Sequence, residues 1–309
     1  MSGRQTLDEM MPDMPKSLED AVQTKTATYE ILQHEAKVYQ SLRRVDSPHF
    51  ISLLDRGRVP YRFIFVVMRL IGRSLWDLRI RTPKRKFSMV TSIRAAEQTL
   101  AGIRDLHMCG YIHRDIKPPN FAVGREEDGD QHTIYIIDFG LSRKYRTDDK
   151  DLRYQRIRVP FRGTTRYASI RALDSREQSR KDDVESWWYM VLEWMTGDLP
   201  WHKCRGKERE KVMQWKKDLR EEKKLEGVLK GTPREFMARI IFYIDTLEYE
   251  SIPDYDYIAA LLEASMHAYH LNYADPPDWD LMVTYLGPRY AKNTSYFSRE
   301  GSTSRSCEK

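Results

Sequence analysis

Residues 113–120 read HRDIKPPN and residues 138–140 read DFG, and these two short motifs decide the fold. The apolar stretches beside them, FAV at 121–123 and TIYII at 133–137, are predicted to pair as a hairpin. That pairing would bring Asp115, Asn120 and Asp138 together. Phosphoryl transfer needs a carboxylate that accepts a proton from a hydroxyl group, and a carboxylate and an amide oxygen that hold Mg²⁺ against phosphates. The motifs therefore predict this chemistry.

Lys117 follows Asp115 by two residues and is placed to neutralise a transferring phosphoryl group. The alternative interpretation is that these polar residues only cap loops. Capping alone does not require eight fixed identities at this spacing, so we favour the catalytic interpretation.

Composition places the chain among folded proteins. It has 309 residues, a formal charge of +6 and 40% hydrophobic residues, which excludes a disordered chain. Three widely spaced cysteines give neither a disulfide framework nor a zinc site, so we expect a reducing compartment, the cytoplasm, with the nucleus as the alternative. The longest apolar run, at 63–68, is too short to span a bilayer, and the modest charge does not imply nucleic acid. We expect neither a membrane nor a nucleic-acid partner.

The order of patterns along the chain predicts an α+β fold. Residues 1–25 are polar and are expected to be irregular, whereas 28–42 show helical periodicity and 50–70 read as a hairpin. Helices are predicted at 74–81, 89–109, 184–197, 206–222, 234–246 and 255–267, and the helix at 184–197 is apolar on all sides. The layout is a small strand-bearing part followed by a large helical part.

The segments HRDIKPPNFAVG, DFGLSRKY, FRGTTRYASI and RKDDVESWWYM resemble the casein kinase 1 superfamily of protein kinases, and within it the tau-tubulin kinase-like branch. The resemblance runs from about residue 28 to about residue 279. It implies a bilobal kinase fold with a small, incomplete, β-rich N-lobe. The expected divisions are an irregular segment at 1–25, a partial N-lobe at 26–70, a helical C-lobe at 71–280 and a disordered tail at 281–309.

The resemblance also implies roles for single residues. Asp115 would be the catalytic base and Lys117 the phosphate-contacting lysine of a serine/threonine kinase. Asn120 and Asp138 would hold Mg²⁺ and, through it, ATP. Asp183 would anchor the backbone near residues 113 and 114. The implied partners are protein substrates, acidic or already phosphorylated, bound by a monomer.

Three further positions complete the implied nucleotide site. Glu35 stands at the place of the family's helix-C glutamate. Met68 and Leu70 stand at its adenine-binding hinge, where an apolar slot with two backbone hydrogen-bond sites suits a purine. For Met68, ordinary core packing is an equal alternative.

The segment from 141 to 166 contains nine Lys or Arg residues and three Asp residues. It is either a solvated basic loop or a surface for acidic substrates, because guanidinium groups pair well with phosphate and carboxylate. Arg166 matches an arginine near the family's anion site. Lys211, Lys216 and Lys217 are candidates for a neighbour, and the sequence does not choose among them.

The chain departs from the family near its N-terminus. No glycine occurs between Gly3 and Gly57, so the glycine-rich hairpin that covers phosphates in kinases is missing. The family's nucleotide-anchoring lysine is expected where this chain has Ala21, and Lys16 and Lys25 are the nearest candidates.

Three hypotheses follow. The first is an active serine/threonine kinase, favoured by the intact acidic and basic motif residues. The second is a weak or inactive pseudokinase that binds partners through its basic face, favoured by the missing hairpin. The third, a nucleic-acid-binding protein, has only charge behind it, and the charge lies in one loop and not in a long stripe with interleaved aromatics.

Overall fold

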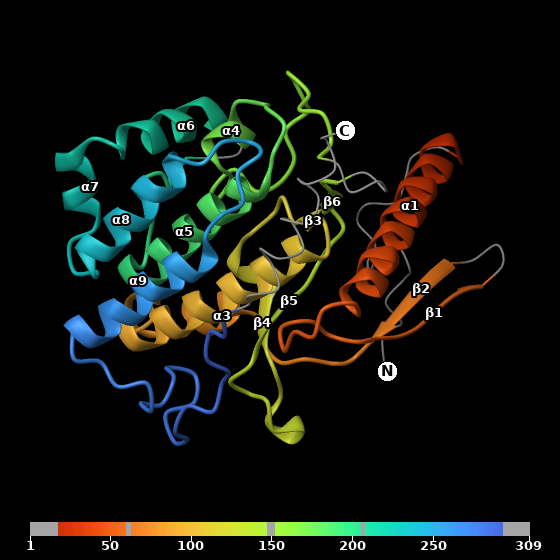
Figure 1. The fold of residues 1–309 in the computed structure, drawn as a ribbon. Coiled ribbons are helices and arrows are strands. Elements are labelled where there is room, and N and C mark those ends of the chain that lie inside the picture. The colour runs from red at the N-terminus through yellow and green to blue at the C-terminus, as the bar shows by residue number, and fades with distance from the viewer. Residues whose placement is uncertain (1–17, 60–62, 147–151, 205–207, 293–309) are drawn as a thin grey trace, which may run out of the picture.

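The computed structural model describes residues 18–59, 63–146, 152–204 and 208–292, and it shows a small lobe beside a large helical lobe (Figure 1). This arrangement confirms the predicted α+β, bilobal fold. In the part of the chain that is described, no helix has the length and apolar character needed to cross a membrane.

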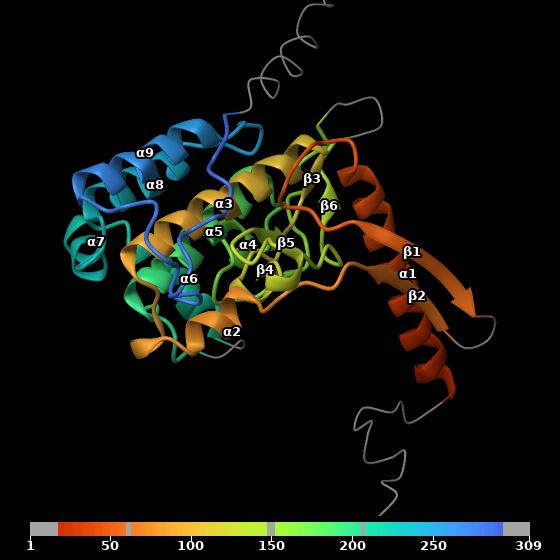
Figure 2. The ribbon, with the colours of Figure 1, turned by 90° about the horizontal axis from the view of Figure 1, so that it is seen from below.

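The small lobe consists of one helix and one hairpin. Helix α1 (Leu18–Leu42) packs against the antiparallel strands β1 (Leu53–Val59) and β2 (Phe63–Met68). Ala36, Tyr39 and Leu42 are buried on the inner face of α1, as the helical periodicity predicts. Figure 2 shows the hairpin and α1 extending away from the large lobe.

The first prediction to correct concerns residues 18–25, which we expected to be irregular. They form the first two turns of α1. The helix therefore begins at Leu18, ten residues before the start of the periodic pattern at Thr28. The segment contains neither proline nor glycine, so a helix nucleated by packing farther along can propagate through it at little cost.

The large lobe is built on helices. Their bounds are α2 (Leu75–Ile80), α3 (Met89–Met108), α4 (Ile170–Leu173), α5 (Arg180–Thr196), α6 (Arg209–Asp218), α7 (Glu222–Val228), α8 (Arg234–Asp245) and α9 (Tyr255–Ala268). Short 3₁₀ turns lie at Pro83–Arg85, Pro118–Asn120 and Glu126–Asp128.

Helix α5 forms the centre of this lobe. All its residues except Lys181 and Thr196 are buried, as its uninterrupted apolar pattern predicts. The indole of Trp187 donates to Thr99 Oγ1 at 3.0 Å, and the indole of Trp188 donates to the Met237 carbonyl at 3.0 Å. These contacts fix α5 between α3 and α8, so the first turn of α5 is a rigid support for the loop that lies against it.

Two pairs of very short strands carry the motif residues. Strands β4 (Phe121–Val123) and β5 (Ile134–Ile136) pair antiparallel, as predicted. Strands β3 (Tyr111–Ile112) and β6 (Arg143–Lys144) also pair, which the sequence did not indicate because two residues are too few for a pattern. Strands β3 and β4 flank the 113–120 motif in the sequence, and strands β5 and β6 flank the 138–140 motif, so paired strands hold both ends of each motif.

The expected disordered tail needs a second correction, because residues 281–292 are described and several of them are anchored to the large lobe. The Tyr285 ring stacks on His132 at 5.6 Å, and the Leu286 N–H donates to His132 Nδ1 at 2.8 Å. Tyr290 donates to Asp256 at 2.7 Å. The polar composition of this segment led us to expect that the entropy cost of ordering it would keep it disordered. These aromatic and polar contacts offset that cost. The rest of the tail lies outside the described residues.

Candidate active site

The loop at 113–120 is held from below by Asp183, in the first turn of α5. Its two carboxylate oxygens accept the backbone N–H groups of His113 at 2.6 Å and Arg114 at 2.8 Å, and His107 Nε2 lies 2.9 Å away. Burial raises the pKa of Asp183, but the partners His107 and His113 outweigh burial and hold this pKa below its usual value. The carboxylate therefore stays charged and fixes the backbone, as the resemblance implies. This support is needed because Arg114 has a φ of +67°, a strained value for a residue with a side chain.

Asp115 is buried at the tip of this loop and has two side-chain partners. Its Oδ2 lies 2.6 Å from Lys117 Nζ, and its Oδ1 accepts from the Thr164 hydroxyl at 2.7 Å. The chain approaches closely here: Gly163 has a φ of +106°, and a Cβ on it would lie 2.6 Å from the Arg114 carbonyl oxygen. The carboxylate is thus fixed beside a cation, with a hydroxyl donor on its other oxygen.

Asn120 lies beside Asp115 and across the hairpin from the second motif. Its Nδ2 donates to the Asp115 carbonyl at 2.9 Å, and its own carbonyl accepts the Ile137 N–H at 3.0 Å. Asp138 follows Ile137 directly, has a φ of +63° and is exposed. The structure therefore brings Asp115, Asn120 and Asp138 into one neighbourhood.

These groups match the donor set of a magnesium site shared with phosphates. Mg²⁺ prefers oxygen ligands and in such sites takes one or two carboxylates, phosphate oxygens and waters. Asp138 offers an exposed carboxylate, and Asn120, whose Nδ2 turns inward, offers its Oδ1. No cluster of three or more His, Cys, Asp or Glu residues that could hold a metal occurs within the described ranges. The residues thus fit a metal held jointly with a nucleotide, and not a metal held by the protein alone.

Glu35 on α1 connects the small lobe to the second motif. Its Oε1 accepts the Phe139 N–H at 3.2 Å. The Phe139 ring packs edge-on against Tyr39, with centroids 5.0 Å apart, and in a tilted arrangement against His113, with centroids 5.7 Å apart. Burial raises the pKa of Glu35, the Phe139 N–H lowers it in part, and the nearby charge of Asp138 raises it further. Helix α1 and both motifs therefore form one packed unit.

The cation expected beside Glu35 is not among the residues with described side chains. None of those Lys, Arg or His groups lies within 4.0 Å of the Glu35 carboxylate, and none contributes to its pKa. Lys16 and the side chain of Lys25 lie outside what the structure describes. The raised pKa of Glu35 is what burial without a compensating positive charge produces.

The segment after β2 has an exposed face. Met68 and Leu70 are 37% and 68% exposed, so Met68 is not part of the core. Arg69, between them, pairs with Asp130 at 2.5 Å and with Asp128 at 3.1 Å, which ties the segment to the large lobe. The structure leaves both apolar side chains accessible to a ligand.

Sequence reasoning missed a cluster of three arginines near Asp115. Burial, followed by repulsion from Arg143 and Arg162, lowers the pKa of Arg114 to about 10. Arg162 is exposed and immediately precedes Gly163, which contacts the Asp115 loop. Mutual repulsion among cations marks a place where a bound anion would be favourable. The high count of basic residues at 141–166 signalled the charge but not which residues gather.

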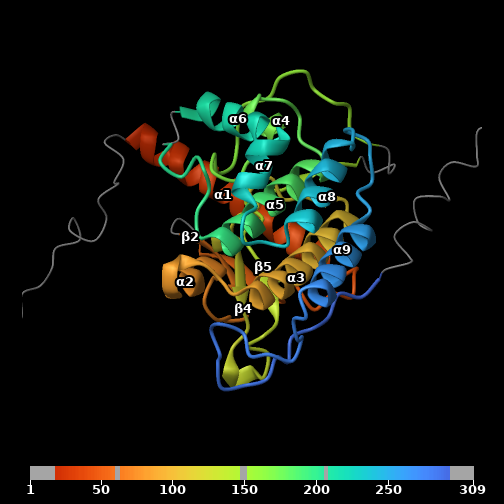
Figure 3. The ribbon, with the colours of Figure 1, turned by 90° about the vertical axis from the view of Figure 1, so that its left-hand side faces the viewer.

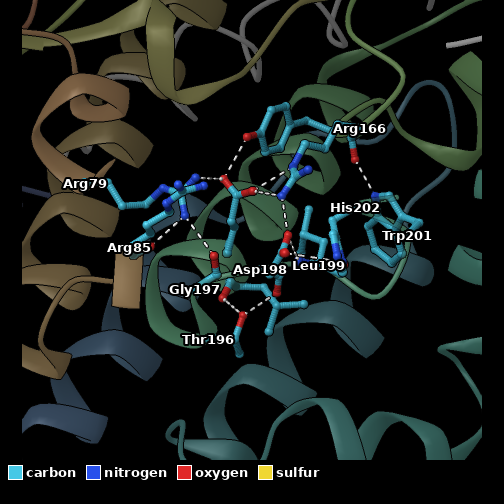
Figure 4. Close-up of polar contacts among 12 residues, drawn as sticks. Arg79, Arg85, Arg166, Thr196, Gly197, Asp198, Leu199, Trp201 and His202 are labelled. Carbon is cyan, nitrogen blue, oxygen red and sulfur yellow. Dashed lines mark hydrogen bonds and ion pairs between the residues drawn. The ribbon is translucent and has the colours of Figure 1, made fainter. Parts of the chain in front are cut away.

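Arg166, expected to bind a substrate anion, is occupied by two carboxylates of the chain itself. Its Nε donates to Glu193 at 2.6 Å, and its Nη2 pairs with Asp198 at 2.5 Å. Arg79 reaches the same Glu193 from the other side at 3.2 Å (Figure 4). Any substrate anion at Arg166 must compete with these partners. Of the exposed arginines in the 141–166 segment, Arg156 pairs with Glu177, whereas the others, Arg153, Arg158 and Arg162, carry no ion pair among the described contacts.

The three lysines considered as neighbours of Arg166 differ in their exposure to solvent. Lys216 is buried, donates to the Ala168 carbonyl at 2.5 Å and lies 4.2 Å from the Tyr189 ring centroid. Burial lowers its pKa well below the usual value. Lys211 and Lys217 are solvent-facing, and Lys211 pairs with Glu208 at 2.6 Å. Lys216 therefore supports the backbone beside Arg166 and does not reach a substrate.

Comparison with known proteins identifies the family of the chain. The protein kinase domain family matches residues 15–241. The serine/threonine-protein kinase spe-6 of Caenorhabditis elegans is 33% identical over 75% of this chain and 60% of its own length. A probable casein kinase I homolog of Encephalitozoon cuniculi is 32% identical over 82% of both chains. A probable serine/threonine-protein kinase of Dictyostelium discoideum is 30% identical over 82% of this chain and 49% of its own.

The chain thus spans about 60% of the Caenorhabditis relative and about half of the Dictyostelium relative. The matched region includes the 113–120 and 138–140 motifs and the support that α5 gives them. From this match and from the geometry of the site, the chain belongs to the protein kinase family.

Proposed function

We propose that the chain is a serine/threonine protein kinase that transfers the γ-phosphoryl group of ATP to hydroxyl groups of acidic or phosphorylated protein segments. Membership of the protein kinase family implies ATP, a divalent metal and protein substrates in general. The observation that carries the proposal is the buried Asp115, fixed by Lys117 and Thr164 on a loop that Asp183 supports.

Each residue then has a separate task. Asp115 orients the acceptor hydroxyl and takes its proton. Lys117, bonded to Asp115, places positive charge beside the reacting oxygens. Asn120 and Asp138 would hold the magnesium ion, which supplies charge neutralisation at the phosphates when bound. Met68 and Leu70 would contact the purine through their accessible apolar surface.

The preference for acidic substrates rests on the arginines. Arg114, Arg143 and Arg162 gather next to Asp115, and Arg158 is exposed on the same segment. We assign the anion-binding role to this cluster in the first place. Arg166 is engaged by Glu193 and Asp198, whereas among the described ion pairs of the cluster only Arg143 has a carboxylate partner, Glu177 at 3.7 Å. The RYAS segment at 166–169 supports the casein kinase 1 superfamily, and the tau-tubulin kinase-like branch within it remains a proposal that rests on the resemblance of the quoted segments.

A second candidate function is a pseudokinase that binds partners without transferring phosphate. The observation that favours it is the Glu35 carboxylate, which accepts a backbone N–H from Phe139 and has no cation among the described side chains. In an active kinase a lysine pairs with this glutamate and contacts the nucleotide phosphates. Losing that charge would weaken both ATP affinity and turnover.

One experiment separates the two candidates. The purified 309-residue chain would be given ATP, Mg²⁺ and an acidic peptide containing serine, with Asp115→Asn and Asp138→Ala as matched variants. An active kinase transfers phosphate, and Asp115→Asn lowers turnover by roughly 10²–10⁴-fold while calorimetry shows unchanged nucleotide binding. Asp138→Ala should weaken the magnesium-dependent part of ATP binding. Peptide binding without any transfer by the unsubstituted chain would establish the pseudokinase instead.

A further inference from the structure

A groove lies on the large lobe between α2, the loop that follows it and the segment at 278–281. It encloses about 580 Å³, within the range of ligand-binding sites. Its apolar lining includes Leu78, Phe87, Trp279 and Leu281. In Figure 3, α2 and the blue segment near the described C-terminal end lie at the same lower edge of the lobe. None of the proposed catalytic residues lines this groove.

The rim of the groove is positively charged. Arg73, Arg81 and Lys86 line it and are exposed, and neither a salt bridge nor a side-chain hydrogen bond occupies them among the described residues. The one carboxylate in the lining, Asp278, already accepts the Ser88 N–H at 2.5 Å. Within the described residues, the three cations at the rim thus have no ion-pair partner.

The loop between two of these cations, Arg81 and Lys86, is held in a strained conformation. Lys84 and Arg85 have φ values of +59° and +52°, which side-chain-bearing residues rarely adopt. Buried Arg79 donates to the Arg85 carbonyl at 2.7 Å, so the strained turn is fixed from beneath (Figure 4). The Thr82 hydroxyl holds the Lys86 carbonyl at 2.7 Å. Strain of this kind persists only where the surroundings enforce it, and it often marks functional surfaces.

We propose that this basic groove binds an acidic segment of a partner protein that carries one large apolar side chain. The apolar side chain enters beside Phe87 and Leu281, and flanking carboxylates pair with Arg73, Arg81 and Lys86. Leu281 is 71% exposed, which is the accessible apolar surface that such an anchor needs. The proposal concerns binding alone and does not require the chain to transfer phosphate.

Charge and shape favour a protein segment over nucleic acid. Single-stranded nucleic acids stack their bases on exposed aromatic faces. Here the Phe87 ring is buried and packs edge-on against Trp279, with centroids 5.8 Å apart, so its face is not a stacking platform. Of the four apolar lining residues named above, only Leu281 is exposed, and its aliphatic side chain suits a side chain of a peptide.

The test measures binding of labelled peptides to the full chain by fluorescence anisotropy. The probe is a short peptide of Glu and Asp residues with one central Leu, and the comparison peptide has Ser in place of Leu. The groove variant Arg81→Glu/Lys86→Glu changes two exposed cations. The matched control, Lys223→Glu/Lys230→Glu, makes the same charge change at exposed lysines on and after α7. A second control, Arg153→Glu/Arg158→Glu, alters the basic segment near the candidate active site.

We expect the groove variant to weaken binding of the Leu peptide by roughly tenfold or more, and each control by less than about threefold. Leu281→Ser, an exposed change that should leave folding intact, should reduce the advantage of the Leu peptide over the Ser peptide. Equal loss in the groove variant and the α7 control would overturn the proposal, because the effect would then be net charge. If only the Arg153/Arg158 variant lost affinity for the Leu peptide, the peptide would bind at the basic segment near the candidate active site, and the proposal would be wrong. If an oligothymidylate bound more tightly than the Leu peptide, and the groove variant abolished that binding, the ligand of the groove would be a nucleic acid and the proposal would be wrong.

Discussion

Replacing Asp183 with asparagine removes the charge that holds the 113–120 loop while keeping the shape of the side chain. In the native protein its oxygens receive the N–H groups of His113 and Arg114 and the Nε2 of His107, at 2.6, 2.8 and 2.9 Å. An asparagine offers one oxygen and one NH₂ group at this place. The NH₂ group would face a donor, so at least one buried N–H loses its acceptor.

Leaving a buried donor unpaired costs about 1–3 kcal/mol, and a hydrogen bond to a charged group is worth about 1.5–3 kcal/mol. Relief of the cost of burying a carboxylate offsets part of this loss. We therefore expect Asp183→Asn to lower the free energy of unfolding by about 2–4 kcal/mol. The effect is a large fraction of the stability of a typical domain, about 5–15 kcal/mol.

The assay is urea unfolding at pH 7 followed by tryptophan fluorescence. Trp187, Trp188 and Trp194 are fully buried on the same helix as Asp183 and report the large lobe. The control is Asp174→Asn, because the carboxylate of Asp174 is exposed and, among the described residues, forms an ion pair only with exposed Arg176, at 2.8 Å. Its cost should stay below about 1 kcal/mol. If Asp183→Asn unfolds at the same urea concentration as the control, the reasoning about unpaired buried donors at this loop is wrong.

Two further predictions concern pH and the site. Burial raises the pKa of Glu97 from 4.5 to about 7. Between these two pH values the folded state therefore binds a proton that the unfolded state has released. The free energy of unfolding should fall by about 3 kcal/mol as the pH rises through this range. Glu97→Gln keeps an acceptor for Tyr273 and should flatten this part of the stability curve between pH 5 and 8, measured by thermal unfolding; an unchanged slope would assign the pH dependence elsewhere. Thr164→Val removes the hydroxyl that donates to Asp115 and should lower phosphoryl transfer roughly ten- to hundredfold with ATP affinity unchanged, while Thr164→Ser should retain activity. Full activity of the valine variant would show that this hydrogen bond does not position Asp115.

Local patterns predicted those parts of the molecule whose determinants lie close together in the sequence. The helix containing Glu35 has a periodic apolar face, and the pairing of FAV with IYI follows from two adjacent β-forming stretches. Because that hairpin is local, the approach of Asn120 to the residues before Asp138 was predictable as well.

Contacts between distant segments were not predictable in the same way. Nothing near Arg166 in the sequence indicates that Glu193 and Asp198, on and after α5, neutralise it. Lys216 lies in a basic helix, and its burial depends on the ring of Tyr189 from another helix. Charge patterns identify basic residues, but only the tertiary arrangement decides which of them find internal partners.

The β1–β2 hairpin has a consequence for handling the protein in solution. Among the described strands β2 pairs only with β1, and its residues Val67 and Met68 are 40% and 37% exposed. An apolar strand with one open edge is a template for another strand, and the lobe that carries it has much less buried surface than the helical lobe. Self-association on warming or storage should therefore begin at the hairpin while the tryptophan-rich lobe is still folded. Charged substitutions along β2 would then extend shelf life without raising the melting temperature of the main core.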